Sequence, residues 1–200
     1  MSPFLTLGHA TRPIDDFLAL LRDHDVKAVA DVRTVPRSRA NPQFSREALE
    51  ASLRGAGIRY VHFPTLGGLR RPRPDSPNAG WRNSSFRGYA DHMQTEEFSR
   101  GLQELLSLSA ETQSAGGRVA LVCAEMVPWR CHRSLVADAL LVRGHAVDEL
   151  IGDSRLRPHT LTPFARVDGE RITYPPPDPA IEDTATRDIP TEHTTTEPPR

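Results

Sequence analysis

The first part of the chain, up to about residue 150, contains short, mostly apolar runs separated by segments in which apolar residues recur every three or four positions. The short runs are typical of buried strands, and the longer spacing is typical of helices with one buried face. The predicted strands are 4–7, 28–32, 58–63, 119–122 and 147–151. The predicted helices are 14–24, 45–55, 95–106 and 131–143, with short helical turns near Tyr89.

This alternation of strands and helices predicts an α/β domain. Successive parallel strands need crossover connections, which are right-handed and place helices against the sheet. We therefore expect a three-layer fold with a mostly parallel five-stranded sheet and helices on both faces. Ligands of such sheets bind outside the carboxyl ends of the strands, so polar side chains that follow the strands are the first candidates for a site.

The composition changes near residue 173. Residues 1–172 form the predicted domain, which ends in a short hairpin around Asp168 and Gly169. Residues 173–200 are rich in Pro, Thr, Asp and Glu and show no apolar periodicity. Such a segment cannot bury enough apolar surface to offset the entropy lost on ordering, so we expect a disordered C-terminal tail.

Composition also limits the compartment and the class of protein. Two cysteines are too few for a disulfide framework, so they are expected to be thiols, metal ligands or reactive groups. No apolar run approaches the roughly 18 residues that a membrane-spanning helix needs, and the first residues do not resemble a signal peptide. We therefore expect a cytoplasmic protein with no membrane partner. The sequence does not indicate an oligomeric state.

The net charge of −1 is divided unevenly along the chain. The tail holds six acidic and two basic residues, which leaves 23 basic and 20 acidic residues in 1–172. Eleven arginines and only three acidic residues lie between Arg33 and Arg87. Lys27 is the single lysine, so nearly every cation is a guanidinium, which suits bidentate contact with phosphate or carboxylate. A small anionic or phosphorylated ligand is the expected partner.

Polar side chains occur where three of the predicted strands end. These are His9 after the first strand, Asp31 and Arg33 at the second, and Cys123 and Glu125 at the fourth. Because parallel strands end at the same edge of a sheet, we expect these residues to line one concavity and to include catalytic groups. For His9 and Asp31 the alternative is that they only cap helices or fix loops.

The segment from Cys123 to Arg133 is the densest in chemistry, because it joins a strand end to a helix start. Cys131 lies at the predicted helix N-terminus among cationic side chains, which would lower its pKa and make it a nucleophile. Those neighbours are Arg130, His132 and Arg133. The same helix start and arginines could instead hold an anion without any covalent step.

Other interpretations of this segment stay open. Cys123, Cys131 and His132, together with Glu125, could bind zinc, although the C-x7-C spacing lacks the paired C-x2-C of common zinc sites. A phosphatase-like loop is disfavoured, because the gap from Cys123 to Arg130 is one residue longer than in tyrosine phosphatases. Both cysteines could also be structural. If Cys131 is reactive, it should be alkylated faster than Cys123, which we expect to be the more buried.

Several separated motifs together resemble the DUF488 family of bacterial and archaeal proteins. They are Thr6-Leu-Gly-His-Ala10, Asp31-Val-Arg33 with Pro36 and Ser38, Leu66-Gly-Gly68, an aromatic segment with Phe86, Tyr89 and Met93, Cys123-Ala-Glu125 and Cys131-His-Arg133. The resemblance covers about residues 4–152 and implies an α/β domain in which these motifs cluster. It implies no substrate, cofactor or reaction, and Ala10 stands where the family has a hydroxyl residue.

Three functions are consistent with these features. The first is a small enzyme that acts on a phosphorylated or nucleotide-like anion at the carboxyl edge of the sheet. Its expected binding residues are Arg33, Arg37, Arg70, Tyr89, Arg130, His132 and Arg133, and its candidate catalytic residues are Cys123, Glu125, Cys131, Asp31 and His9. The second is a nucleic-acid-associated protein in which Trp81, Phe86 and Tyr89 stack on bases. The third is a non-catalytic regulatory domain. The sequence favours the enzyme and names no cofactor.

Overall fold

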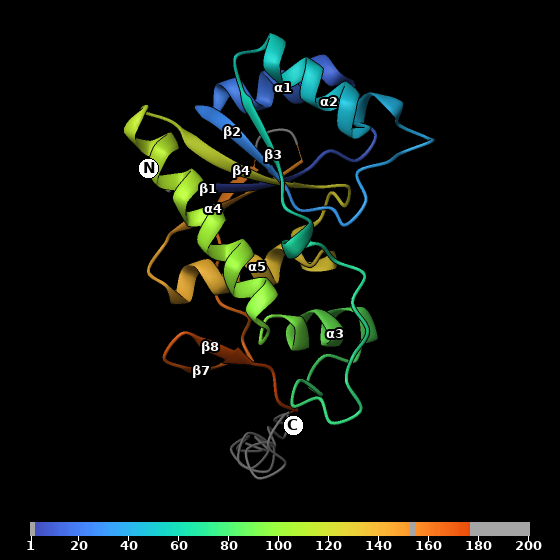
Figure 1. Ribbon diagram of the computed structural model, residues 1–200, viewed down its shortest axis with the longest axis vertical. Coiled ribbons are helices and arrows are strands. Elements are labelled where there is room, and N and C mark those ends of the chain that lie inside the picture. The colour runs from blue at the N-terminus through green and yellow to red at the C-terminus, as the bar shows by residue number, and fades with distance from the viewer. Residues whose placement is uncertain (1–2, 153–154, 177–200) are drawn as a thin grey trace, which may run out of the picture.

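The computed structural model describes residues 3–152 and 155–176. Its centre is a six-stranded sheet in the order β3-β2-β4-β1-β5-β6 (Figure 1). The strands are β1 (Phe4–Gly8), β2 (Val26–Asp31), β3 (Arg59–His62), β4 (Arg118–Cys123), β5 (Val147–Ile151) and β6 (Arg155–Pro158). Strands β1 to β5 are parallel, and β6 pairs antiparallel with β5 at one edge. The predicted α/β fold with a mostly parallel sheet is confirmed.

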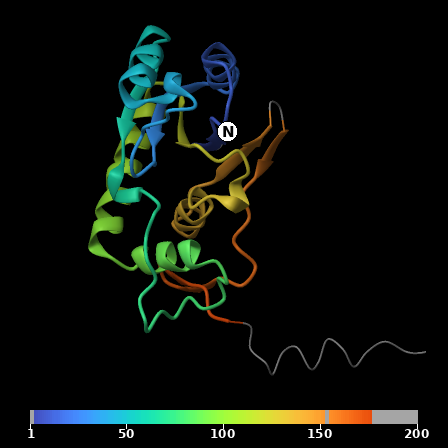
Figure 2. The same ribbon diagram turned by 90° about the vertical axis from the view of Figure 1, so that its right-hand side faces the viewer.

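Helices cover both faces of the sheet, as predicted (Figure 2). α1 (Ile14–Asp23) and α2 (Arg46–Gly55) pack on one face, and α4 (Glu96–Ser114) and α5 (Arg133–Val142) pack on the other. α3 (Ser84–His92) lies near the start of α4, beyond the sheet (Figure 1). The 3-10 helices are η1 (Pro42–Phe44), η2 (Pro64–Leu66) and η3 (Pro128–Arg130). Within the described residues, no helix has the length and apolar character needed to cross a membrane.

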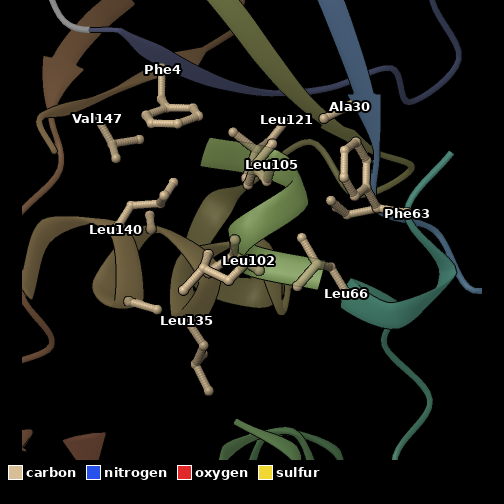
Figure 3. Close-up of a cluster of buried hydrophobic side chains, with 14 of the residues drawn as sticks. Phe4, Ala30, Phe63, Leu66, Leu102, Leu105, Leu121, Leu135, Leu140 and Val147 are labelled. Atoms are coloured by element: carbon tan, nitrogen blue, oxygen red, sulfur yellow. The ribbon is translucent and has the colours of Figure 1, made fainter. Parts of the chain in front are cut away.

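Two apolar cores lie on opposite sides of the sheet, because successive strand residues point to opposite faces. Leu5 and Val122 belong to the core under α1 and α2, while Phe4 and Leu121 belong to the core under α4 and α5. Figure 3 shows the latter core, where helix residues Leu102, Leu105, Leu135 and Leu140 gather around strand residues. Each fully buried Leu or Phe contributes about 1.5–3 kcal/mol, so these cores hold the central strands of the sheet in place.

Several elements differ from the prediction. α4 extends to Ser114 instead of ending near residue 106, and the turns predicted near Tyr89 form the helix α3. Strand β6 was not predicted, because all four of its residues are exposed and they show no apolar alternation, so only pairing with β5 defines it. The helix predicted to start at residue 131 starts at Arg133. It starts later because η3 precedes it and Cys131 has an extended backbone, with φ −132° and ψ 139°.

The predicted hairpin around Asp168 and Gly169 is confirmed as β7 (Arg166–Asp168) and β8 (Arg171–Thr173). Beyond it, the Tyr174 side chain is fully buried, and its backbone N–H donates to Asn78 Oδ1 at 2.8 Å. Defined contacts therefore continue past the expected domain boundary at residue 172. The disorder predicted for the tail concerns mainly residues 177–200, which lie outside the described residues.

Candidate active site at the carboxyl edge of the sheet

The loops that follow β1 and β4 leave the sheet toward opposite faces, although the two strands are neighbours. The chain after β1 leads to α1, and the chain after β4 leads to α5 on the other face. His9 N donates to Cys123 O at 2.9 Å and Ala10 N donates to Ala124 O at 3.0 Å, so the loops run together briefly before they part. Such a divergence creates the crevice in which ligands of open α/β sheets bind.

A cleft with two adjoining lobes occupies this crevice. The lobes have volumes of about 480 and 460 Å³. Both are lined by Ala10, Gly68, Leu69, Cys123, Ala124 and His132. The first lobe adds the largely apolar Phe86, Tyr89 and Met126 beside Arg130, and the second adds Arg37, Ser38 and Asn41. Cys123 and His132 therefore lie where the two lobes join.

The predicted residues that follow the strands do come together at this end of the sheet. They are His9, Asp31, Arg33, Cys123, Glu125, Cys131 and Arg133. Their surroundings divide them into a cluster around the two thiols and a buried network around Asp31.

The thiol cluster consists of Cys123, Cys131 and His132, whose sulfur and nitrogen atoms all lie within 4.8 Å of one another. β4 positions Cys123 at its last residue, and the turn before α5 positions the other two. His132 Nε2 lies 2.9 Å from Val32 O. A carbonyl oxygen can only accept, so Nε2 carries the proton and donates it. Burial lowers the pKa of His132, so the ring is neutral and Nδ1, which lies 3.8 Å from Cys131 Sγ, carries no proton.

The two thiols share their protons unequally. A hydrogen bond from Cys123 lowers the pKa of Cys131, burial opposes this effect, and the charge of Arg133 lowers it further, to about 6. The hydrogen bond to Cys131, burial and the negative charge of Cys131 raise the pKa of Cys123 well above its ordinary value. These shifts favour the thiolate form of Cys131, with the Cys123 thiol as its hydrogen-bond donor.

Arg133 stabilises the thiol cluster from the protein interior. Its side chain is completely buried, and its guanidinium donates to Glu125 O and, at 2.8 Å, to Met126 O. These bonds fix the loop between the two cysteines, while the positive charge stabilises the thiolate. Arg133, predicted to bind a ligand, thus holds the loop and tunes Cys131 within the protein.

Asp31, Arg33 and His9 form the buried network. Asp31 accepts from Arg33 Nε at 2.8 Å and Nη2 at 2.5 Å, and it also accepts from Tyr60 Oη at 2.8 Å. Arg33 Nη1 donates to Phe44 O and lies 3.2 Å from His9 Nε2. Asp31 is fully buried, and these contacts occupy its carboxylate. The network anchors the loop after β2 beneath the second lobe.

His9 has both ring nitrogens engaged. Nδ1 lies 2.9 Å from Ala10 O and so donates to it, which leaves Nε2 to accept from Arg33. The ring also stacks on Phe44 at a centroid distance of 4.1 Å. Burial lowers the pKa of His9 to about 4, so the imidazole is neutral and rigid. These contacts suit a positioning role better than proton transfer.

Other predicted binding residues have different surroundings. Arg37 and Arg130 are exposed and line the second and first lobes respectively. Glu125 lines the first lobe, and its Oε1 accepts from Val127 N at 3.3 Å. Arg70 instead bonds Glu97 at 3.2 to 3.3 Å and, among the described residues, lies outside the lining of both lobes. Tyr89 contributes to a wall but is almost fully buried.

The expected order of burial of the two cysteines is wrong. Cys131 is only 4% exposed, whereas Cys123 is partly exposed and lines both lobes. The reason is local, because the turn of η3 carries Cys131 inward before α5 begins, and β4 ends with Cys123 at the mouth of the crevice.

The aromatic residues proposed to stack on bases pack against one another or against the core, and only Tyr89 is fully buried. Trp81 lies against Phe86, Phe164 and Tyr174, with ring centroids 4.7 to 5.6 Å apart. The Tyr89 hydroxyl donates to Leu66 O at 2.8 Å. Tyr89 is therefore unavailable for stacking on a base, whereas Trp81 and Phe86 remain partly exposed.

Sequence analysis missed a second polar cluster, which lies between α5, β5 and the segment after β6. His159 bonds Asp138 through Nε2 and Glu149 through Nδ1, each at 2.8 Å. The Tyr174 hydroxyl donates to Asp138 at 2.8 Å. Burial lowers the pKa of His159, but hydrogen bonds and charge from both carboxylates outweigh it and raise the pKa to about 9. No sequence spacing signals this cluster, because its members come from separate elements.

Fold and cleft together define a doubly wound α/β protein with a pair of thiols at the point where its strand connections diverge. The chain matches the family DUF488, described as a domain of unknown function, over residues 13–140, and it belongs to that family. The resemblance seen in the motifs is thereby confirmed. No curated protein and no solved structure matches the chain. The family description names no activity, so function rests on the chemistry of the cleft.

Proposed function

We propose that the protein is an enzyme that acts on a phosphorylated or nucleotide-like anion bound across the two lobes. The observation that carries this proposal is that Cys123 and His132 line both lobes. A ligand that fills both lobes would therefore pass over the thiol cluster, where reactive groups are concentrated. Perturbed titratable groups at the floor of a cleft are a common mark of an active site.

The two lobes suit different parts of such a ligand. Phe86, Tyr89 and Met126 give the first lobe the apolar walls that a planar ring requires. Arg37 offers the second lobe an exposed guanidinium, beside the hydroxyl of Ser38 and the amide of Asn41. Guanidinium and neutral donors together favour a phosphate group. Arg130 supplies a second cation at the first lobe.

Ligand-dependent thermal stabilisation tests the binding step. We expect nucleoside mono- and diphosphates to raise the melting temperature more than the matching nucleosides or inorganic phosphate do, because only the complete ligand fills both lobes. Arg37→Gln and Arg130→Gln should each weaken binding about tenfold or more, since each removes a charge-assisted contact. Arg39→Gln is the matched control, because Arg39 is also exposed but, among the described residues, lies outside the lining of both lobes.

Mass spectrometry of the ligand after incubation with the protein tests the catalytic step, because turnover changes the mass of the ligand. Turnover that disappears in Cys131→Ser, while the ligand still raises the melting temperature, would support an enzyme. Binding without turnover of any stabilising ligand would favour the regulatory domain instead. Equal stabilisation of the wild type and both arginine variants would remove the basis of the proposal.

A further inference from the structure

We propose that Cys123, Cys131 and His132 form a binding site for a divalent transition metal of the zinc type, with the remaining coordination position open to the cleft. Two sulfurs and one imidazole nitrogen within 4.8 Å of one another match the spacing of donors around one tetrahedral ion. Thiolate and imidazole are the donors that zinc prefers. The C-x7-C spacing hides this set in the sequence, because a strand end and a helix start supply the two thiols separately.

The orientation of His132 supports this assignment. Its Nε2–H donates to Val32 O at 2.9 Å, which fixes the tautomer and leaves the Nδ1 lone pair on the side of Cys131. Metal-binding histidines usually have their second nitrogen held in this way. Gly68 keeps the space beside Nδ1 clear, because a Cβ at this position would lie only 2.9 Å from that nitrogen.

Two thiolates would balance the charge of a dication. Metal binding would form two metal–sulfur bonds and one metal–nitrogen bond, and the protons of the cysteine thiols would pass to solvent. Proton release on addition of the ion is therefore an additional expected signature.

The cleft decides what kind of metal site this would be. Structural zinc sites are closed by four protein ligands, whereas catalytic sites have three and leave one position for water or substrate. Here Cys123 and His132 line both lobes, so the remaining position faces the cleft. The proposal that a metal binds here rests on the donor geometry alone. The further proposal that the bound metal activates water or an anionic substrate also rests on the proposed function.

Cobalt titration of the full chain, reduced and treated with chelator, tests the site. We expect one Co²⁺ per chain, a thiolate-to-cobalt charge-transfer band in the near ultraviolet, and displacement by one equivalent of Zn²⁺. Cys123→Ser, Cys131→Ser and His132→Gln should each weaken binding by more than the roughly 10–100-fold typical of losing an outer-shell partner. Gly68→Ala should also weaken it, although it removes no ligand.

His62→Gln is the matched control. His62 Nε2 lies 2.8 Å from Arg33 O, and His132 Nε2 bonds the neighbouring carbonyl of Val32, so both histidines donate to the same loop. His62, however, lies outside the thiol cluster. The variant should bind Co²⁺ like the wild type. A wild-type chain without the charge-transfer band, or a band unchanged in His132→Gln, would overturn the proposal. Melting curves recorded for every variant separate lost binding from lost folding.

The two proposals fail separately. If nucleotides stabilise the protein through Arg37 and Arg130 but no cobalt band forms, the metal site is wrong and the proposed function stands. If cobalt binds as expected but no phosphorylated compound raises the melting temperature, the metal site stands and the proposed ligand is wrong.

Discussion

Gly8 shows how closely the two loops that frame the cleft approach each other. It is the last residue of β1, and a Cβ built on it would lie 1.9 Å from Glu125 O and 2.7 Å from Met126 Cα. Both contacts are with backbone, so no side chain can rotate away to make room. The Arg133 guanidinium donates to the carbonyl oxygens of Glu125 and Met126, so this loop cannot shift away from Gly8 without losing these hydrogen bonds.

We therefore expect Gly8→Ala to destabilise the protein by about 1–3 kcal/mol, the usual cost of overpacking. Gly55→Ala is the control, because a Cβ there meets nothing within 4 Å and Gly55 lies at the end of α2. That change should be neutral or slightly stabilising. Urea unfolding of the three proteins measures the difference, and equal stability of the two variants would show that the loop can move aside.

At the same scale, sequence reasoning located the site residues better than it assigned their roles. The position of Cys123 and Cys131 at the carboxyl edge follows from strand periodicity and needs no tertiary information. Their relative burial does not, because it depends on the 3-10 turn η3, which the apolar pattern of the sequence does not reveal. The contacts of His9 with Arg33 and Phe44 likewise depend on tertiary structure, because the three residues come from separate segments of the chain.

Among the elements, those with strong apolar periodicity were predictable and those held by pairing alone were not. β1 to β5 and the helices between them carry buried faces that the sequence displays directly. β6 has four exposed residues, and only the register with β5 makes it a strand. The segment after β8 is the opposite case, because Tyr174 lies just beyond a periodic hairpin in a Pro-rich stretch and is nevertheless fully buried.

Two truncations locate the C-terminal boundary of the fold. Removing residues 177–200 should leave the melting temperature nearly unchanged, because their composition offers no apolar face. Removing residues 173–200 also deletes Tyr174, whose backbone carbonyl accepts from Gly80 N and whose hydroxyl donates to Asp138. We expect this second truncation to cost about 3–5 kcal/mol, as for the loss of a buried aromatic residue.

Thermal melts of both truncated chains beside the full chain measure these effects. A substantial loss of stability in the shorter truncation would show that the acidic tail contributes contacts of its own. Equal stability of all three chains would show that Tyr174 is dispensable, and the boundary would then return to residue 172.

Across the whole molecule, two polar systems with different chemistry adjoin α5, the thiol cluster at its start and the His159 cluster at Asp138 within it. The thiol cluster opens into the cleft at the carboxyl ends of the strands. The cluster of His159, Asp138 and Glu149 instead ties α5 to β5 and to the segment after β6. Strand order made the first predictable, because it places all carboxyl ends together. The His159 cluster depends on where β6 and the β7–β8 hairpin pack against the rest of the protein, and the sequence does not specify this.

The His159 cluster makes a contribution to stability that depends on pH. The pKa of His159 is raised from 6.5 to about 9 in the folded state, so the folded protein holds this proton more tightly than the unfolded chain. The contribution is therefore fully present below pH 6.5 and is lost as the pH rises through 9. A shift of this size corresponds to about 3 kcal/mol. Asp138, Glu149, Arg157 and Tyr174 are the charged and titratable groups around it.

Cys131 acts in the opposite sense over part of this range, because its pKa is lowered to about 6 and its thiolate gains stability as the pH rises. The prediction therefore concerns a difference, the unfolding free energy of the wild type minus that of His159→Gln, in which the contribution of Cys131 cancels. This difference should fall by about 3 kcal/mol between pH 6 and pH 10, with most of the fall between 6.5 and 9. Urea unfolding at several pH values measures it. A difference that stays constant or grows with pH would mean that His159 is neutral in the folded protein, and the two carboxylates would then need another cation to offset their burial.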